Sequence, residues 1–363
     1  MNRFFPEIKK NFGFGCMRLP VNGDEIDTAA FCAMIDRFIS AGFNYFDTAR
    51  PYHWLRSEKA LKTCLADRYD RSQFLLADKL SPTFFEKEEE IRPLIEDQLA
   101  ACGVEYFDFY LMHAMSAERH QQYTKMHAYD IAQQMKAEGK LRHVGMSFHD
   151  SAEVLDKILT DRPELEFVQL QFNYLDYNDP KVQSRLCYEV CRKHGKPVFV
   201  MEPVKGGTLV NLPEAALELL PNGSPASYAI RYAAGFEDIV MVLSGMSNME
   251  QMEDNISYMA DFKPLSAEEH EAIEKVRTLY QAQNKIPCTA CRYCVDGCPA
   301  GIPIPEIFAL RNAKLGGEEV DAAAYSAFPA TAANCVDCGQ CESACPQSLQ
   351  IRDLLREVDK AFS

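Results

Sequence analysis

The stretch Phe107-Asp-Phe-Tyr-Leu-Met-His113 is a short, largely apolar segment with a polar residue at its end. Similar segments recur at intervals of about thirty residues along the first two thirds of the chain. Each is short enough to be a β-strand, and several are rich in Val, Ile, Phe and Tyr, which favour strands. The other seven are Phe12–Met17, Phe43–Asp47, Phe74–Lys79, His143–Ser147, Phe167–Gln171, Pro197–Met201 and Ile239–Ser244.

The segments between these strands have the spacing of amphipathic helices. The apolar residues Phe31, Met34, Ile35 and Phe38, for example, fall at i, i+3, i+4 and i+7. Eight strands that alternate with helices over about 250 residues predict an α/β protein with a (β/α)8 TIM barrel. A doubly wound open sheet is the alternative, although it would usually have Gly-x-Gly-x-x-Gly after its first strand. The residues from Gly13 to Arg18 do not supply that turn.

Polar residues end three consecutive predicted strands, at Asp47, Lys79 and His113. Barrel enzymes place their chemistry at the C-terminal ends of strands. A charged residue that ends an apolar strand is costly unless it is paired. Tyr52 follows in the loop beyond Asp47, and Ser147 ends the fifth strand. We therefore expect these residues to form an active site.

The last eighty residues carry one cysteine pattern twice, as Cys-x2-Cys-x2-Cys-x3-Cys-Pro. This spacing is that of bacterial ferredoxins with two [4Fe–4S] clusters, in which the fourth cysteine of each run binds the other cluster. The pattern predicts one cluster on Cys288, Cys291, Cys294 and Cys345. It predicts the other on Cys335, Cys338, Cys341 and Cys298.

Zinc and disulfide bonds are the competing uses of these cysteines. Zinc sites often use two Cys-x2-Cys pairs, whereas each run here holds four cysteines in a tighter array. Disulfides require an oxidising compartment, and the segment Met1–Lys10 lacks the apolar core of a signal peptide. The other six cysteines are expected to behave as small apolar residues. They are Cys16, Cys32, Cys64, Cys102, Cys187 and Cys191.

Composition limits the classes of partner. The net charge of -15 argues against nucleic acid, since a phosphate backbone requires a basic face. No stretch approaches the roughly 18 apolar residues of a membrane span. We expect a cytoplasmic protein with oxygen-sensitive clusters and no membrane span.

Four motifs resemble the aldo/keto reductase family. They are Asn44-Tyr-Phe-Asp-Thr-Ala-Arg-Pro-Tyr52, Leu76-Ala-Asp-Lys79, Phe109-Tyr-Leu-Met-His113 and Leu141-Arg-His-Val-Gly-Met-Ser147. The resemblance covers about residues 10–260 and includes all four members of the family's Asp-Tyr-Lys-His tetrad. With its two cysteine runs, the whole chain resembles the subgroup that has a C-terminal iron–sulfur domain.

The resemblance implies reduction of a carbonyl group, or the reverse oxidation of an alcohol, with NAD(P). Tyr52 would donate the proton, and a nearby Lys79 ammonium would lower its pKa from the usual value near 10. Asp47 would hold Lys79 charged, and His113 would orient the substrate oxygen. The apolar residues Trp54 and Phe148 hint at a partly apolar pocket.

The resemblance also implies a nucleotide site. Ser147 and Gln169 match residues that hold the nicotinamide carboxamide, and Met201 replaces the aromatic residue that stacks on the ring in many relatives. A thioether can still pack against a ring. No Lys or Arg between residues 244 and 255 matches the clamp for a 2′-phosphate, so NADP is inferred from the family alone. A helix N-terminus suits the adenosine phosphate, and the residues expected there are Ser244, Gly245, Ser247, Gln251 and Asn255, with a capping box at Ser247-x-x-Glu250.

Three domains follow from these assignments. We expect the barrel at 1–262, a linker helix at 263–286, and a ferredoxin-like domain at 287–363. Apolar residues at helical spacing in 304–315 and 351–362 predict that this last domain is small and mostly helical.

Two functions remain open at this point. The first is a nicotinamide-dependent carbonyl reductase joined to an electron-transfer module. The second is an electron-transfer protein whose barrel binds another cofactor, such as a flavin, or only supports the clusters. Phosphate sites after the last two strands, at Gly206–Gly207 and Ser244–Gly245, could accept a flavin. A hydride carries two electrons whereas a cluster usually takes one, so we expect a separate redox protein as partner.

Overall fold

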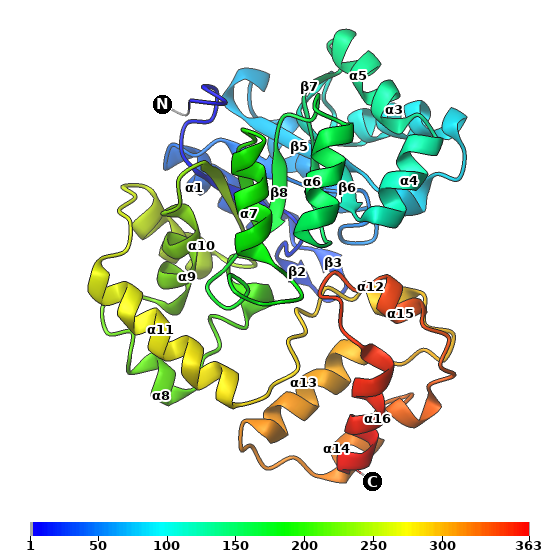
Figure 1. Cartoon of the computed structure of the whole chain (residues 1–363). Helices are drawn as coiled ribbons and strands as arrows, with labels where there is room; N and C mark the ends of the chain where they lie inside the picture. Colours follow the sequence, from blue (N-terminus) through cyan, green and yellow to red (C-terminus); the bar gives the residue numbers. More distant parts are fainter. Residues whose placement is uncertain (1–2, 363) are drawn as a thin grey trace. The chain divides into compact units, whose positions relative to one another are not determined.

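The computed structural model describes residues 3–362 and contains a closed barrel of eight parallel strands. The strands follow one another around the barrel in the order β1-β4-β5-β6-β7-β8-β9-β10, which closes on β1. Figure 1 labels β5, β6, β7 and β8 of this barrel, with helices around them. The eight predicted segments all become these strands. Their bounds are β1 Phe12–Gly15, β4 Tyr45–Asp47, β5 Leu75–Leu80, β6 Phe107–Met115, β7 Leu141–Phe148, β8 Val168–Gln171, β9 Val198–Met201 and β10 Ile239–Gly245.

Helices follow most strands and cover the barrel. A short hairpin of β2 (Val21–Asn22) and β3 (Glu25–Ile26) precedes them and was not predicted, because each strand has only two residues. The helices are α1 Thr28–Ser40, α2 Ser57–Leu61, the π-helix η1 Lys62–Ala66, α3 Glu88–Cys102, α4 Ala117–Lys125, α5 Ala128–Ala137, α6 Ala152–Asp161, α7 Ser184–Lys193, α9 Pro225–Ala234 and α10 Met249–Met259.

Alternate residues of the strands fill the barrel interior, because side chains on a strand alternate between its two faces. Tyr45, Phe109 and Phe199 belong to this buried core, with ring centroids 5.2 to 5.6 Å apart. Phe5 packs edge-on against Phe109, with centroids 5.1 Å apart. The interior is therefore packed with side chains rather than open.

The same alternation carries the polar residues to the C-terminal end of the interior. Asp47 lies two residues after Tyr45, and Lys79 lies two residues after the core residue Ala77. His113 likewise follows Leu111 of the core. Each polar side chain thus continues an inward-facing row of apolar ones, and the barrel brings three strand ends to one site.

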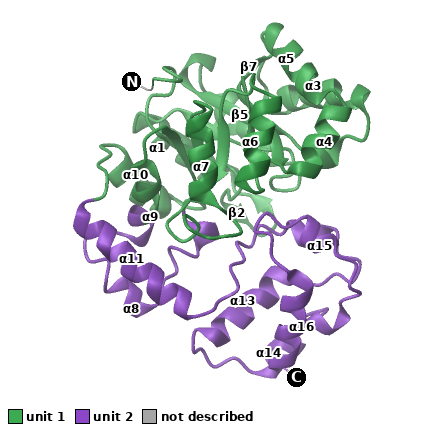
Figure 2. Cartoon of the chain, in the orientation of Figure 1, with its two compact units in different colours: residues 1–203, 229–265 green, residues 204–228, 266–363 purple. Residues whose placement is uncertain are grey.

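The chain divides into two compact units, which Figure 2 distinguishes by colour. The first unit comprises residues 1–203 and 229–265 and contains the barrel strands. The second comprises residues 204–228 and 266–363, so it includes a segment that lies between β9 and β10 in the sequence.

The second unit is mostly helical, as predicted for the cysteine-rich region. Its core contains the buried residues Ile307, Phe308, Leu355 and Val358, which come from two helices. The helices are α8 Glu214–Leu217, α11 Ala267–Ala282, α12 Tyr293–Asp296, α13 Ile304–Leu315, α14 Ala322–Ser326, α15 Gln340–Ser343 and α16 Ile351–Phe362.

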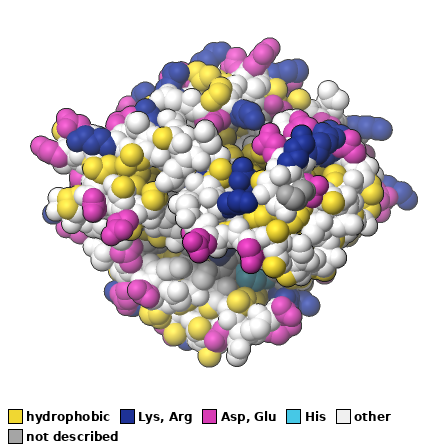
Figure 3. Space-filling view, turned by 90° about the horizontal axis from the view of Figure 1, so that it is seen from below, with side chains coloured by type: hydrophobic (Ala, Val, Ile, Leu, Met, Phe, Trp, Pro, Cys, Tyr) yellow, Lys and Arg dark blue, Asp and Glu magenta, His cyan; other side chains and the backbone are white. Residues whose placement is uncertain are grey.

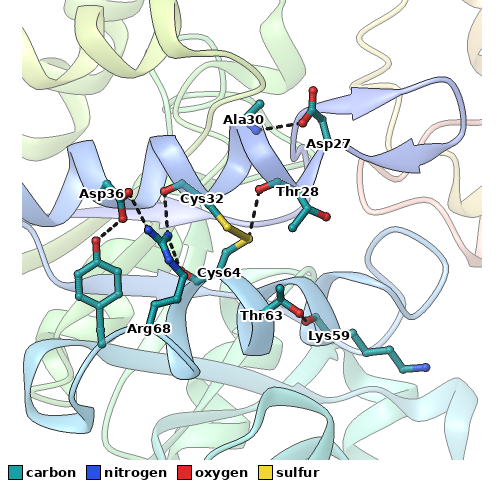
Figure 4. Close-up of a disulfide and its surroundings, with 10 residues drawn as sticks. Asp27, Thr28, Ala30, Cys32, Asp36, Lys59, Thr63, Cys64 and Arg68 are labelled. Atoms are coloured by element: carbon teal, nitrogen blue, oxygen red, sulfur yellow. Dashed lines mark hydrogen bonds and ion pairs between the residues drawn. A yellow bond between two sulfur atoms is a disulfide. The ribbon is translucent and has the colours of Figure 1, made fainter.

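A disulfide joins Cys32 of α1 to Cys64 of η1, with Cα atoms 4.7 Å apart (Figure 4). The prediction that these two cysteines act as small apolar residues was therefore wrong. Arg68 donates to the carbonyl oxygens of both residues, at 3.3 and 3.2 Å, and pairs with Asp36 at 2.8 Å. The bond and this arginine together tie η1 to α1.

The surface carries charges of both signs. On the face shown in Figure 3, acidic side chains are scattered among basic and apolar ones rather than gathered in a single patch. Among the described residues, no helix is both long and apolar enough to cross a membrane.

Candidate functional site

A buried ion pair forms the centre of the candidate active site. Lys79 Nζ lies 2.6 Å from Asp47 Oδ1 and donates to the Thr48 carbonyl at 2.7 Å. The same nitrogen lies 3.3 Å from the Tyr52 hydroxyl. Asp47 and Lys79 are 4% and 1% exposed, whereas Tyr52 is partly exposed. Lys79 is thus held by two oxygens and presents its charge to the phenol.

Burial governs the ionisation of this group. It raises the pKa of Asp47 above its usual value, against the opposing effect of Lys79. It also raises the pKa of Tyr52 well above 10, and the negative charges of Asp47, Asp78 and Glu202 add to the rise. The net pKa of Tyr52 is therefore raised, whereas the sequence predicted a lowered one, because burial and nearby acidic groups dominate it. Tyr52 therefore retains its proton.

The loop that carries Tyr52 has an unusual backbone. The next three residues, His53, Trp54 and Leu55, have positive φ angles of 49°, 56° and 69°. Such angles are uncommon outside glycine, and they cluster at functional sites. His53 Nε2 accepts a hydrogen bond from the Leu19 amide at 2.9 Å, which ties the loop to the segment after β1. Trp54 is 65% exposed, whereas Phe148 is buried.

His113 reaches the site from the end of β6. Its Nδ1 lies 2.6 Å from Ser81 Oγ, and both side chains are buried. Burial lowers the pKa of His113 well below 6.5, and the positive charges of Lys79 and Arg119 lower it further. His113 is therefore neutral at physiological pH. The rings of Tyr52 and His113 lie 6.4 Å apart, edge to face. Ser81 was not identified from the sequence, because a serine after a strand has no distinctive pattern.

The residues expected to hold nicotinamide lie on neighbouring strands. Ser147 of β7 is in register with Gln169 of β8, and both side chains are buried. Ser147 Oγ accepts a hydrogen bond from the Ala114 amide at 2.7 Å. Gln169 Oε1 and Asp47 Oδ2 are buried and have no hydrogen-bond partner among the described residues. Met201 ends β9 and is partly buried. These two buried acceptors have the chemistry to bind the N–H or O–H groups of a polar ligand.

The segment expected to hold the adenosine phosphate runs from β10 into α10. Ser247, Gln251 and Gly245 are exposed, while Ser244 and Asn255 are buried and joined by a 2.8 Å hydrogen bond. The buried hydrogen bond between Ser244 and Asn255 therefore stabilises the turn between β10 and α10.

The capping box predicted at Ser247-x-x-Glu250 was wrong. Asn248 caps α10, since its Oδ1 accepts from the Gln251 amide at 2.9 Å. Ser247 instead donates to the Arg18 carbonyl at 2.9 Å. A side chain at Gly245 would place its Cβ 3.4 Å from Arg18 Cβ. Arg18 is thus a cation beside this segment, although it lies far from residues 244–255 in the sequence.

Cysteines of the two runs lie near one another in mixed sets, although no group of three or more His, Cys, Asp or Glu side chains among the described residues is arranged to hold a metal ion. Burial raises the pKa of the Cys294 thiol to about 12, and the nearby Cys291, Cys288 and Cys345 thiols add to the rise. Three of these belong to the first run and one to the second. A small cavity is lined by the complementary set, Cys298, Cys335, Cys338 and Cys341. Sulfur ligands in sets of four are those that iron–sulfur clusters require.

The segment 204–228 contributes to the same unit through Lys205 and Gly206. Lys205 is 3% exposed and its Nζ lies 3.4 Å from Gln347 Oε1, two residues after Cys345. Gly206 has a φ of 62°, and a Cβ there would lie 2.4 Å from the carbonyl oxygen of Thr289. Only glycine fits this close approach to the turn after Cys288.

Sequence profiles of two families match the chain. The aldo/keto reductase family matches residues 11–278, and a 4Fe-4S dicluster domain matches residues 287–349. The two matches are consistent with the barrel and the cysteine-rich unit described above.

Individual relatives match most of the barrel. An uncharacterized oxidoreductase, YqkF, of Bacillus subtilis is 23% identical, over 72% of this chain and 90% of its own. The L-galactose dehydrogenase of Arabidopsis thaliana is 26% identical, over 74% and 90%.

Solved structures show the same fold. The aldo-keto reductase AKR11C1 of Bacillus halodurans superposes with a TM-score of 0.60 at 24% identity, covering 73% of this chain and 91% of its own. An aldo-keto reductase of Klebsiella pneumoniae in complex with NADPH gives a TM-score of 0.60 at 18% identity, covering 74% and 90%. The chain is therefore an oxidoreductase of the aldo/keto reductase family that carries a C-terminal 4Fe-4S dicluster domain.

Proposed function

We propose that the barrel reduces an aldehyde or ketone with NAD(P)H, or runs the reverse oxidation of an alcohol. The observation that carries this proposal is the position of Lys79 Nζ, 2.6 Å from Asp47 Oδ1 and 3.3 Å from the Tyr52 hydroxyl. Bound nicotinamide would supply a hydride to the carbonyl carbon. The oxygen then needs a proton, and Tyr52 is the acid within reach of it.

The ionisation of Tyr52 suits this role. Burial raises its pKa, so the phenol keeps its proton until negative charge develops on the carbonyl oxygen. As the proton leaves, the Lys79 ammonium stabilises the phenolate, because opposite charges attract strongly in a buried site. Asp47 holds Lys79 in place for this step. Neutral His113 orients the carbonyl by a hydrogen bond.

Ser147, Gln169 and Met201 would hold the nicotinamide end of the nucleotide. Gln169 Oε1 is an acceptor without a protein partner, which suits a carboxamide N–H. The exposed Gly245, Ser247 and Gln251 would contact the adenosine end, with Ser244 and Asn255 supporting them. The NADPH in the Klebsiella structure supports NADP, whereas a similar Escherichia coli protein is an NADH-specific methylglyoxal reductase. Activity should therefore be assayed with both NADH and NADPH.

The cysteine-rich unit would hold two [4Fe–4S] clusters that carry single electrons. One cluster would bind Cys288, Cys291, Cys294 and Cys345, and the other Cys298, Cys335, Cys338 and Cys341. The proximity of each set of four supports this assignment. The partner would be a separate redox protein, and a flavin would be needed for electrons to pass between the hydride chemistry and the clusters.

The test is nucleotide oxidation by anaerobically purified protein. NADH and NADPH are each mixed with a panel of aldehydes and ketones, and the loss of absorbance of the reduced nucleotide is followed. Turnover with at least one carbonyl compound supports the reductase. Absence of turnover across the panel, together with a flavin released by acid, would instead support an electron-transfer protein whose barrel binds that flavin.

A further inference from the structure

Ser81 and His113 form a buried pair at the edge of the candidate active site. Ser81 Oγ lies 2.6 Å from His113 Nδ1, and the two residues are 2% and 7% exposed. Ser81 lies two residues after Lys79, so the alternation of the extended chain carries both toward the barrel interior. The end of β5 and the residue that follows it therefore supply the partner of Tyr52 and the partner of His113.

The direction of this hydrogen bond follows from the partners available. Among the described residues, His113 Nδ1 is the one partner of the Ser81 hydroxyl. If Nδ1 carried the proton, it would donate to Ser81, and the buried hydroxyl hydrogen would have no acceptor. A buried donor without an acceptor is disfavoured. The hydroxyl therefore donates to Nδ1, which must be unprotonated.

The other ring nitrogen must then carry the proton. A neutral imidazole has one N–H and one acceptor nitrogen, and the bond at one nitrogen sets the state of the other. His113 Nε2 has no hydrogen-bond partner among the described residues, and it is not among the polar atoms that are sealed from solvent. A donor N–H is thus exposed where a ligand can reach it.

We infer that Ser81 is a positioning residue that holds His113 in the Nε2–H form, so that His113 donates to the substrate carbonyl oxygen. The inference rests on the proposed carbonyl reduction. In the other tautomer, Nε2 would turn a lone pair toward an oxygen that gains negative charge, and the contact would be repulsive. Tyr52 gives up its proton, whereas His113 keeps its own and only polarises the carbonyl.

The tautomer can be measured without any reaction. Protein labelled with ¹⁵N-histidine is examined by long-range ¹H–¹⁵N NMR, and His113→Gln assigns the signal by its loss. In the native chain and in Ser81→Thr, which keeps a hydroxyl, we expect a protonated Nε2 and an unprotonated Nδ1. In Ser81→Ala, we expect a mixture of tautomers. A native His113 protonated at Nδ1, or an unchanged signal in Ser81→Ala, would overturn the inference.

Kinetics with 4-nitrobenzaldehyde and the nucleotide that the native protein uses provide the second measurement. Removal of one donor to a developing oxyanion costs about 10²–10³-fold in turnover. We therefore expect Ser81→Ala to lose about tenfold or more in kcat/KM, and Ser81→Thr to recover most of it.

Ser184→Ala is the matched control, since Ser184 is a buried barrel serine whose hydroxyl donates to the Gln171 carbonyl. If Ser184→Ala loses as much kcat/KM as Ser81→Ala, the effect of Ser81 is a general loss of stability and the inference is refuted. If the native protein reduces no carbonyl compound, the proposed function fails, while the NMR result still decides the tautomer.

Discussion

Lys79 places its ammonium nitrogen 2.6 Å from Asp47 Oδ1, and both side chains are almost completely buried. Loss of one partner of such a pair leaves an uncompensated charge inside the protein, which typically costs about 3–5 kcal/mol. Variants of Lys79 or Asp47 would therefore combine loss of chemistry with loss of stability. Tyr52 is partly exposed, and it offers a cleaner test of the mechanism.

Tyr52→Phe should abolish most carbonyl reduction while the fold and nucleotide binding remain intact. The ring is retained, and only the hydroxyl near Lys79 Nζ is lost. General acid catalysis contributes about 10²–10⁴-fold, so turnover should fall by that factor. Steady-state kinetics and nucleotide titration measure the two effects separately. A variant that turns over within a few-fold of the native rate would contradict the assignment.

Glu166→Gln should reduce stability at neutral pH but much less at pH 3. Burial would raise the pKa of Glu166, but bonds from His143, Lys136 and the Val144 amide outweigh it and lower the pKa to about 2. This stabilisation is present above pH 4.5 and disappears as the pH falls toward 2. The difference between the two pKa values corresponds to about 3.4 kcal/mol at most.

Urea unfolding of native and variant protein at pH 7 and pH 3 measures this effect. Glu164→Gln is a control on the same loop, because the one ion pair of its carboxylate with the described residues is a 3.7 Å contact with Arg162. Equal losses of stability at both pH values would show that the role of Glu166 does not depend on its charge.

Cys291→Ser and Cys338→Ser should each damage a different cluster. Anaerobically reconstituted native protein should contain close to eight iron and eight sulfide per chain, since each [4Fe–4S] cluster contributes four of each. Each variant should lose about half. Iron and sulfide analysis with electron paramagnetic resonance of the reduced protein distinguishes the clusters. Stoichiometric zinc without iron-dependent absorbance in the native protein would refute the assignment.

Cys32→Ala should destabilise oxidised protein and leave reduced protein nearly unchanged. The disulfide spans a sequence separation of 32 residues. A loop of that size contributes about 3–4 kcal/mol through the unfolded chain. Unfolding of both proteins with and without dithiothreitol measures the difference. If dithiothreitol leaves the stability of the native protein unaltered, the bond contributes nothing in solution.

Flavin-free protein mixed with NADH or NADPH in an anaerobic stopped-flow instrument should not show rapid bleaching of its clusters. Hydride transfer moves two electrons together, whereas a cluster usually accepts one. None of Asp47, Tyr52, Lys79 and His113 can divide the pair. Addition of a flavin should restore bleaching. Rapid bleaching with the nucleotide alone would instead show direct coupling between the two chemistries.

Much of the barrel could be predicted because its signals are local. Each strand is an apolar run, so composition and spacing were sufficient for the barrel, whereas the roles of Asp47, Tyr52, Lys79 and His113 were implied by the resemblance to the family. The hairpin of β2 and β3 was missed because two-residue strands have no periodicity. The cap of α10 was misplaced by one residue, since Ser247 and Asn248 can both cap a helix.

The remaining features depend on tertiary contacts. Ser81, the residue that follows β5, meets His113, and Cys32 meets Cys64 across two helices, with a sequence separation of 32 in each pair. The pKa of Tyr52 depends on burial and on carboxylates from three other segments. No pattern within a single segment contains this information.

Residues 204–228 belong to the second unit although they precede β10 in the sequence. This limits where the gene can be cut to produce one unit alone, or joined to produce a fusion. A stop codon after residue 265 would not release a self-contained barrel. Such a truncation would remove Gln347, which contacts the buried Lys205, and Thr289, which lies against Gly206. A ferredoxin module attached to the end of an ordinary reductase would likewise need a matching loop after β9. The boundary of this unit is therefore spatial, and a single cut in the gene cannot follow it.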